Sequence, residues 1–232
     1  MVWNKGLTKE THPALRKTSE TMRRKRIDNF KKWRDEMKEQ GRIKSSYPPF
    51  AKNGHLAELI GVVLSDGHIH VHDRCESLRI VGDAGKPGFV QYSAQLVHSV
   101  FGKQPWVMQR NDSRGVNVTL YEKNIAKRLG IPAGSRAKHE FIVPTWIERN
   151  KDHKIRFLRG LYEAEGSISH HPATYTHKFI FSNANTHLLE LVARLVRELG
   201  FTVSVSSRKT QVSRKDEVQK LSDLIQFRHY GS

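Results

Sequence analysis

The chain has 232 residues, of which 37% are hydrophobic, and this length suits one or two compact domains. No segment approaches the roughly 18 apolar residues that a membrane-spanning helix requires, and the N-terminus lacks the apolar core of a signal peptide. The single cysteine, Cys75, excludes an internal disulfide and fits a reducing compartment. We therefore expect an intracellular protein, in the cytoplasm, nucleoid or an organelle matrix, rather than a secreted or membrane protein.

The charge is strongly unbalanced. Lysine and arginine together number 40 against 23 acidic residues, which gives a net charge of +17 and an isoelectric point near 10.1. Such an excess indicates a polyanionic partner, most often nucleic acid. An anionic membrane surface is the alternative that the charge alone leaves open.

Residues 1–50 predict a basic arm that carries a net charge of +8. Phe30, Trp33 and Met37 recur at helical spacing, and Pro13 suits the first turn of a helix. The RRKR run at 23–26 interrupts any long apolar face, so the arm cannot form a core by itself. A solvated, partly disordered tail is the alternative. Two adjacent prolines and two glycines then predict a linker over 41–54.

A nine-residue stretch occurs twice, as LIGVVLSDG at 59–67 and as LRGLYEAEG at 158–166. The two copies are 99 residues apart, and each is an apolar segment that ends in a carboxylate followed by glycine. A repeat at this distance indicates two copies of one domain-sized unit rather than a solenoid. We therefore divide the remainder of the chain into a first half, 55–150, and a second half, 151–232.

Each half follows the order α-β-β-α-β-β-α. In the first half, helical spacing and alternation predict helices over 56–66, 87–101 and 122–129 and strands over 68–72, 77–81, 105–110 and 115–121. In the second half they predict helices over 151–165, 188–199 and 215–226 and strands over 167–169, 176–181 and 201–206. Asn150 is the expected N-cap of one motif helix, and Gly67 the expected left-handed cap of the other. The fold class is α+β, with antiparallel sheets that carry helices on one face and are wet on the other.

Glycine in a helix interior costs about 1 kcal/mol relative to alanine, so Gly61 and Gly160 require an explanation. Small residues recur four apart around both, which would allow two backbones to approach closely. We expect the two motif helices to pack against each other and to relate the halves by a pseudo-two-fold axis.

That packing would bring Asp66 and Glu165 together. A carboxylate at a helix C-terminus is unfavourable by about 0.3–1 kcal/mol, and two adjacent ones repel. Divalent cations would resolve both problems, and oxygen ligands suit Mg²⁺. We include Ser65 and Ala164, which directly precede the two acids, in the expected metal site. Such centres beside a basic surface are typical of metal-assisted phosphodiester hydrolysis.

The paired motifs ELIGVVLSDGHI and FLRGLYEAEGSI resemble those of single-chain LAGLIDADG homing endonucleases, over about residues 55–230. The resemblance implies two αββαββα repeats that form an antiparallel-sheet saddle over double-stranded DNA, with the motif helices at the centre. It implies a monomer in which Asp66 and Glu165 are the metal-binding catalytic acids and hold two or more Mg²⁺ ions. It also implies cleavage of both strands of a long asymmetric site, with short 3′ overhangs. The arm's opening, WNKGLTKETHP, resembles small modular DNA-binding segments that are appended to many homing nucleases.

The resemblance also implies a basic side chain near each cleavage position. In the first half the candidate is Lys138, with Arg136 as the alternative, and in the second half Lys209 or Arg214. Contact with phosphate without a catalytic role remains open for each of them.

DNA should be read by the polar faces of the strands, because base edges in the major groove require hydrogen-bond donors and acceptors. The candidates in the first half are His68, His70, His72, Arg79, Gln109, Arg110, Asn117 and Thr119. Those in the second half are Ser167, Ser169, His171, Lys178, Ser204, Ser206 and Arg208. The two sets differ, so the target should be non-palindromic. Phosphate contact or plain solvation is the alternative for any one of them.

Two further alternatives stay open. The three histidines at 68, 70 and 72, together with Asp66 and Cys75, could form a zinc site. The same fold could also serve an intron-RNA maturase or a DNA-binding regulator that does not cleave. Paired carboxylates facing phosphate favour the nuclease, because a pure binder gains nothing from them.

Overall fold

The structure, a computed structural model, describes residues 5–111, 113–172 and 175–228. The chain consists of two compact units, Met1–Tyr47 and Pro48–Ser232. The division falls inside the linker expected over 41–54. None of the described helices combines the length and apolarity needed to cross a membrane.

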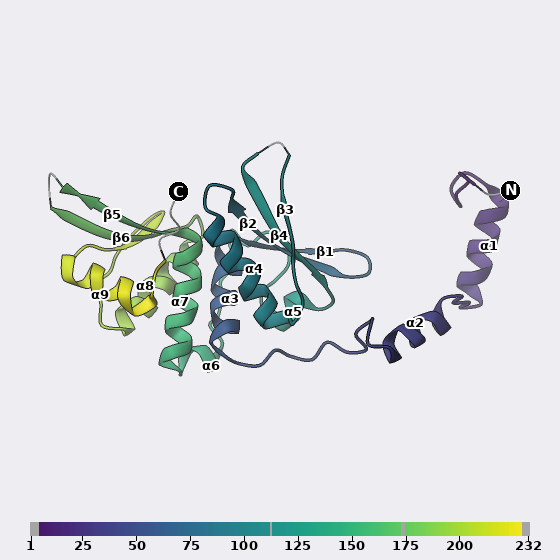
Figure 1. Cartoon of the computed structure of the whole chain (residues 1–232), viewed down its shortest axis with the longest axis horizontal. Coiled ribbons are helices and arrows are strands. Elements are labelled where there is room, and N and C mark those ends of the chain that lie inside the picture. Colours follow the sequence, from purple (N-terminus) through teal and green to yellow (C-terminus); the bar gives the residue numbers. More distant parts are fainter. Residues whose placement is uncertain (1–4, 112, 173–174, 229–232) are drawn as a thin grey trace. The chain divides into compact units, whose positions relative to one another are not determined.

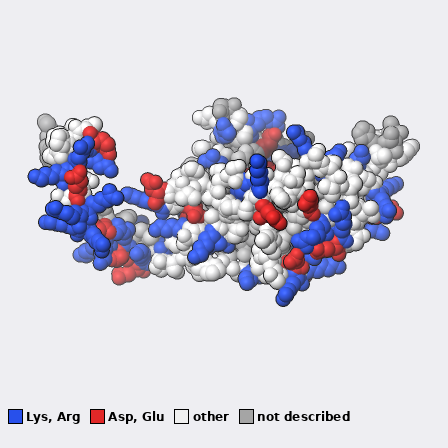
Figure 2. All heavy atoms as spheres, turned by 180° about the vertical axis from the view of Figure 1, so that it is seen from behind, with Lys and Arg blue, Asp and Glu red and all other residues white. Residues whose placement is uncertain are grey.

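The N-terminal unit contains two helices, α1 (Pro13–Arg24) and α2 (Lys31–Glu39). Neither helix has a buried residue, and the side chains of Phe30 and Trp33 are 68% and 52% exposed. Lysine and arginine cover most of this unit in Figure 2. Its two helices therefore present charge and some apolar surface to solvent without a core beneath them.

The first half of the larger unit contains one four-stranded antiparallel sheet, in the order β1-β2-β4-β3. Its elements are α3 (Gly54–Ser65), β1 (Gly67–Val71), β2 (Glu76–Asp83), α4 (Pro87–Phe101), β3 (Trp106–Gln109), β4 (Gly115–Glu122) and α5 (Ile125–Leu129). Gly102 and Gly130 end α4 and α5 in the left-handed conformation. A short helix, α6 (Thr145–Glu148), follows Pro144 and leads into the second half.

The second half repeats this order with a sheet arranged β5-β6-β8-β7. Its elements are α7 (Lys151–Glu165), β5 (Gly166–His171), β6 (Thr176–Ser182), α8 (Thr186–Glu198), β7 (Ser204–Ser206), β8 (Lys209–Val212) and α9 (Lys215–Ile225). The Asn150 side chain caps α7 by accepting a hydrogen bond from the backbone of His153. The α+β class and the doubled α-β-β-α-β-β-α order are confirmed.

The strand expected over 201–206 is shorter than predicted and starts only at Ser204. The reason is a side chain from α9. The carboxylate of Glu217 accepts hydrogen bonds from the backbone N–H of Thr202, at 2.6 Å, and from its hydroxyl, at 3.1 Å. This segment is therefore anchored to a helix instead of a neighbouring strand.

The motif helices α3 and α7 lie side by side between the two sheets (Figure 1). Their buried side chains join one continuous core, which includes Leu59, Phe157 and Tyr162, each at most 1% exposed. Burying a large apolar side chain contributes about 1.5–3 kcal/mol, so this seam accounts for much of the cohesion between the halves. Helices cover one face of each sheet, and Ile69 and Leu78 point into that covered face.

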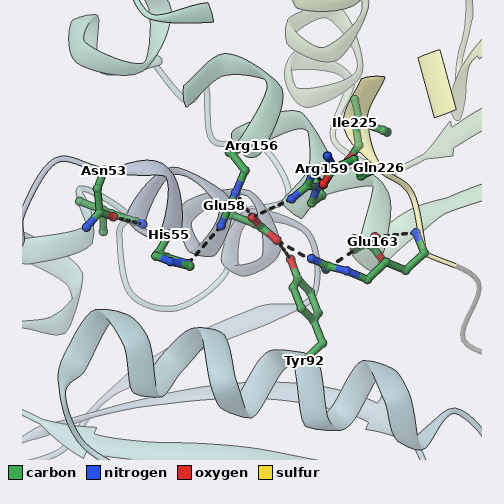
Figure 3. A network of polar contacts seen from close by, with 11 residues as sticks. Asn53, His55, Glu58, Tyr92, Arg156, Arg159, Glu163, Ile225 and Gln226 are labelled. Carbon is green, nitrogen blue, oxygen red and sulfur yellow. Dashed lines mark hydrogen bonds and ion pairs between the residues drawn. The ribbon is translucent and has the colours of Figure 1, made fainter. Parts of the chain in front are cut away.

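A buried carboxylate of α3 forms ion pairs across the contact between the two motif helices. Glu58 of α3 is fully buried and forms ion pairs with Arg156 and Arg159 of α7 and with Arg228, which follows α9 (Figure 3). It also accepts a hydrogen bond from the hydroxyl of Tyr92 in α4. Burial of this hydroxyl, and next the charge of Glu58, raise the pKa of Tyr92 above its usual value. The network ties both halves and the C-terminal segment to one acid, and the sequence did not predict it.

Candidate functional site

The two motif helices end in an abrupt change from helix to strand. Asp66 follows the last residue of α3, and Glu165 is the last residue of α7. The left-handed cap predicted at Gly67 is wrong, because this residue already belongs to β1 and has no positive φ. A Cβ on Gly67 would lie 2.5 Å from the Cα of Val63, and one on Gly166 would collide with the carbonyl oxygen of Tyr162. Glycine is required at both places because the departing strand passes close to the helix.

Gly61 and Gly160 lie in the contact between α3 and α7. A Cβ on Gly61 would collide with the carbonyl oxygen of Phe157, and one on Gly160 with the carbonyl oxygen of Glu58. Each contact is with backbone of the opposite helix, which cannot move aside as a flexible side chain could. The two glycines thus set the helix separation, and this separation brings the two C-terminal ends together.

Asp66 and Glu165 are half-buried, and their ionised forms are correspondingly disfavoured. Burial raises the pKa of Asp66 to about 6. Burial also raises the pKa of Glu165 to about 7, with a further contribution from the charge of Asp66. Asp66 lines the same cavity of about 720 Å³ as Ala164 and Gly166, the two neighbours of Glu165, so the ends of the two motif helices lie close together. Within the residues that the structure describes, burial alone shifts the pKa of Asp66, and no hydrogen bond or ion pair to its carboxylate offsets that burial.

The donor set at this position fits a hard cation. Two closely spaced carboxylates, with the backbone of Ser65 and Ala164 beside them, supply oxygen ligands of the kind that Mg²⁺ prefers. Among the described residues, no group of three or more His, Cys, Asp or Glu side chains could hold a metal ion. Water or phosphate oxygens would have to complete the coordination. The same finding gives the zinc alternative no support.

Asn183 contacts Glu165 directly, and the sequence analysis missed it. Its Nδ2 donates a hydrogen bond to Oε2 of Glu165 at 2.6 Å, and its Oδ1 accepts one from the backbone of Asn185 at 2.7 Å. Asp83 makes the same turn in the first half, because its Oδ1 accepts from the backbone of Gly85 at 2.7 Å. The carboxylate of Asp83 forms an ion pair with Arg114, at 3.2 Å, whereas the amide of Asn183 contacts the motif acid Glu165. The sequence feature that could have found Asn183 is Asp83, which lies 100 residues earlier at the similar turn of the first repeat.

The four basic candidates differ in position. The guanidinium of Arg136 lies at the C-terminal end of α3 and donates to the carbonyl oxygens of Val63, at 2.8 Å, and Gly67. Burial lowers the pKa of Arg136 below its usual value. Lys138 and Lys209 have exposed side chains, and Arg214 pairs with Glu217 at 3.0 Å. The alternative, Arg136, is thus the candidate in contact with a motif helix.

A cavity of about 240 Å³ lies beside Arg136 and is also lined by Ser65, His68 and Asn183. Asn185 closes one side of it, because its Nδ2 donates to the carbonyl oxygens of Arg136, at 3.0 Å, and His139, at 2.8 Å. The loop that carries Arg136 in the first half is therefore held by a side chain of the second half.

The strand pairing decides which side chains share the uncovered face of the first sheet. One row across the sheet is His68, Arg79, Thr119 and Trp106, and the next is Val81, Asn117 and Met108. His70 lies on the same face, opposite Ser77, and His72 bonds to that serine at 3.0 Å. Two expectations are wrong: Gln109 pairs with Val116 and so lies on the opposite face, and Thr119 is only 7% exposed. Arg110 is exposed and follows the end of β3.

On the second sheet the corresponding face is rich in hydroxyl groups. Ser167, Ile180, Gln211 and Ser204 form one row, and Ser182, Lys209 and Ser206 the next. Ser169 and Lys178 pair on the same face, and Arg208 is exposed in the turn between β7 and β8. The side chain of His171 lies outside the described part of the structure.

Comparisons with known proteins identify this architecture. Residues 152–228 match the family model of the LAGLIDADG-like domain. No curated protein matches the chain. Among solved structures, mesophilic variants of the homing endonuclease I-DmoI match with a TM-score of 0.52 and 17% identity, covering 74% of this chain and 95% of theirs. I-DmoI in complex with DNA and Mn matches with a TM-score of 0.51 and 18% identity, covering 77% and 99%.

The N-terminal LAGLIDADG domain of DUF199/WhiA is also similar, with a TM-score of 0.52, 13% identity and coverage of 79% of this chain and 86% of that domain. The likeness to these structures is a likeness of fold, because the identities are low. Residues 152–228 match the LAGLIDADG-like domain, and the larger unit of the chain, with its two four-stranded antiparallel sheets, has the fold of the I-DmoI structures.

Proposed function

We propose that this protein is a site-specific, metal-dependent endonuclease that cleaves double-stranded DNA. The proposal is supported chiefly by the contact of the two motif helices at Gly61 and Gly160, together with the cavity that Asp66 shares with Ala164 and Gly166, the neighbours of Glu165. The net charge of +17 supports a polyanionic substrate, and the solved I-DmoI complexes contain DNA with Mn, Mg or Ca.

Asp66 and Glu165 would hold the divalent ions, beside the backbone of Ser65 and Ala164. Bound there, such ions would activate water and stabilise the negative charge that develops on the phosphodiester oxygens. Asn183 fixes the orientation of the Glu165 carboxylate through its hydrogen bond. Arg136 places a positive charge at the negative end of α3, where a scissile phosphate would otherwise meet the helix dipole. Lys138 and Lys209 are exposed and could contact phosphate as the strands pass.

The uncovered faces of the two sheets would receive the DNA, because each continues directly from a motif acid. His68, Arg79 and Asn117 in the first sheet and Ser167, Lys178 and Ser204 in the second present donors and acceptors there. The unlike faces favour a non-palindromic target, which one chain with both repeats could bind as a monomer. The basic N-terminal unit would add phosphate contacts, and cleavage at the two acids would leave short 3′ overhangs.

The competing function is DNA binding without cleavage. The similarity of fold to the LAGLIDADG domain of WhiA favours it as the second candidate. The distinguishing feature is the pair of half-buried acids, since burying two carboxylates side by side destabilises a protein that does not use them.

Incubation of the full chain with Mg²⁺ and a randomised duplex library, followed by sequencing of the cleaved ends, tests the proposal. Asp66→Asn and Glu165→Gln should each lower cleavage of the selected site by at least about 100-fold while duplex binding persists. Glu190→Gln, which changes an exposed acid of α8, is the matched control and should cleave normally. Selection of a bound site without cleavage by the unaltered protein would support the non-cleaving function instead.

A further inference from the structure

The uncovered face of the first sheet carries large apolar side chains that the sequence analysis did not expect. Val81, Trp106 and Met108 are 43%, 68% and 51% exposed. The strand pairing puts them on the same face as His68 and Arg79, next to the polar residues proposed to contact DNA. The opposite face of this sheet also exposes Val71 and Val107, at 59% and 47%, so the large side chains of Trp106 and Met108 are what distinguish the uncovered face. Large exposed apolar groups of this kind indicate an interaction surface rather than core packing.

The corresponding positions of the second sheet are serines. Trp106 lies in the row of His68 and Arg79, and its equivalent in the row of Ser167 and Ile180 is Ser204. Met108 and Val81 flank Asn117 in the next row, and their equivalents flanking Lys209 are Ser206 and Ser182. Three exposed apolar side chains of the first sheet thus occupy the positions of three hydroxyl groups in the second, although the two sheets have the same strand order.

This apolar group is continuous with the candidate site. Val81 lines the same cavity of about 720 Å³ as Asp66, together with Lys86 and Arg114. Arg79 lies between His68 and the Thr119–Trp106 pair. A partner that binds this face must therefore offer both negative charge and apolar groups that contact these side chains.

Duplex DNA offers one base feature that meets an apolar side chain in the major groove, and this is the C5-methyl group of thymine. A serine hydroxyl, in contrast, donates or accepts a hydrogen bond and discriminates little among bases by itself. We propose that Val81, Trp106 and Met108 read thymine methyl groups in one half of the target, whereas Ser182, Ser204 and Ser206 read the other half through hydrogen bonds. This inference rests on the proposed binding of duplex DNA.

Thymine is then preferred at the contacted positions of the half-site under β3, and the serines of β7 impose no such preference on the other half-site. The same side chains favour DNA over RNA, because uracil lacks the methyl group. Specificity for the first half-site then combines apolar contact with the donors and acceptors of His68, Arg79 and Asn117.

Replacement of thymidine by deoxyuridine in the selected target tests the inference with the unaltered full-length protein. The exchange removes one methyl group from the major groove and keeps the base pairing. In the half-site under β3, each replacement at a contacted position should weaken binding about three- to fivefold. The same number of replacements in the other half-site should leave binding within about twofold. Equal sensitivity of the two half-sites, or none in either, would overturn the inference.

Two variants sharpen the result. Trp106→Ser combined with Met108→Ser gives β3 the side chains of β7, and this protein should lose the preference for thymidine at the positions under β3 and keep only the contribution of Val81. Trp106→Phe combined with Met108→Leu keeps apolar contact and should retain the preference for thymidine. Both variants change exposed side chains, so folding should persist and circular dichroism can verify it.

The outcomes also separate this inference from the proposed function. A protein that selects and cleaves a site but ignores deoxyuridine contradicts only the reading of methyl groups. A protein that selects no duplex contradicts the proposed function. Sedimentation shows whether the apolar side chains join two copies of the chain instead. A dimer that the double serine variant dissociates, with DNA binding unchanged, would overturn the inference.

Discussion

The two repeats keep the same helix seam and differ in what surrounds their acids. In both, glycine is packed against the backbone of the opposite motif helix, and a second glycine lets the chain turn from helix into strand. In the first half burial alone shifts the pKa of Asp66, whereas in the second half Glu165 accepts a hydrogen bond from Asn183. Backbone contacts thus fix where the acids lie, and side chains determine how each acid behaves.

Substitutions in the contact between the two motif helices should have the largest effect, because both repeats depend on it. Gly61→Ala and Gly160→Ala place a Cβ against a carbonyl oxygen of the facing helix, so we expect each to destabilise the protein by about 3 kcal/mol or more. Urea denaturation of the larger unit measures this. Gly54→Ala in the same helix as Gly61 is the control, because its Cβ would lie 3.3 Å from a flexible arginine side chain. Equal stability of the three variants would contradict the close contact of α3 and α7.

The next largest loss of stability is expected at Glu58, the buried acid that contacts side chains of both halves. Glu58→Ala leaves the arginines at 156, 159 and 228 without their shared partner, so we expect a loss of about 3–5 kcal/mol. Thermal unfolding measures it, with Glu190→Ala as the control at an exposed acid. Glu58→Gln keeps an acceptor for Tyr92 and should cost less. A neutral effect of Glu58→Ala would show that the network does not hold the halves together.

The acids themselves make the metal-free protein sensitive to pH. Both pKa values are raised on folding, so their contribution to stability is complete below pH 4 and is lost as the pH rises through about 6 and 7. We expect the metal-free protein to lose about 1–3 kcal/mol per carboxylate between pH 4 and pH 8. Unfolding in urea at several pH values, with EDTA or Mg²⁺ present, measures this.

The combined Asp66→Asn and Glu165→Gln variant should lack this dependence on pH, and Mg²⁺ should restore stability at pH 8 only to the unaltered protein. A metal-free protein that is as stable at pH 8 as at pH 4, relative to this variant, would contradict the raised pKa values.

The smallest effect is expected where the surroundings of Asp66 and Glu165 differ, at the hydrogen bond from Asn183 to Glu165. Asn183→Ala removes the hydrogen bond to Glu165 and leaves Asp66 untouched, so we expect cleavage of one DNA strand to slow about tenfold relative to the other. Nicking of a supercoiled plasmid that contains the selected target, with each strand labelled, measures the two rates. Asp83→Ala, at the equivalent turn, is the matched variant. Equal slowing of both strands by Asn183→Ala would argue against a separate role for Glu165.

Much of this site follows from the sequence because its causes are local or repeated. The glycines and acids recur 99 residues apart, and helix and strand periods are visible without tertiary information. Asn183 lies in a turn, where no period marks it, and Glu58 is a charged residue whose burial depends on three distant arginines. Gln109 was misplaced because alternation along a short edge strand does not say which side faces the helices. Only the pairing with Val116 settles it.

The central claim is that Asp66 and Glu165 together hold the ions used for cleavage. Electron paramagnetic resonance of Mn²⁺ bound to the protein with its selected duplex tests this most directly. The unaltered complex should bind Mn²⁺ and cleave, whereas Asp66→Asn and Glu165→Gln should each lose bound Mn²⁺ together with cleavage and still bind the duplex. Undiminished Mn²⁺ binding and cleavage in both variants would contradict the account.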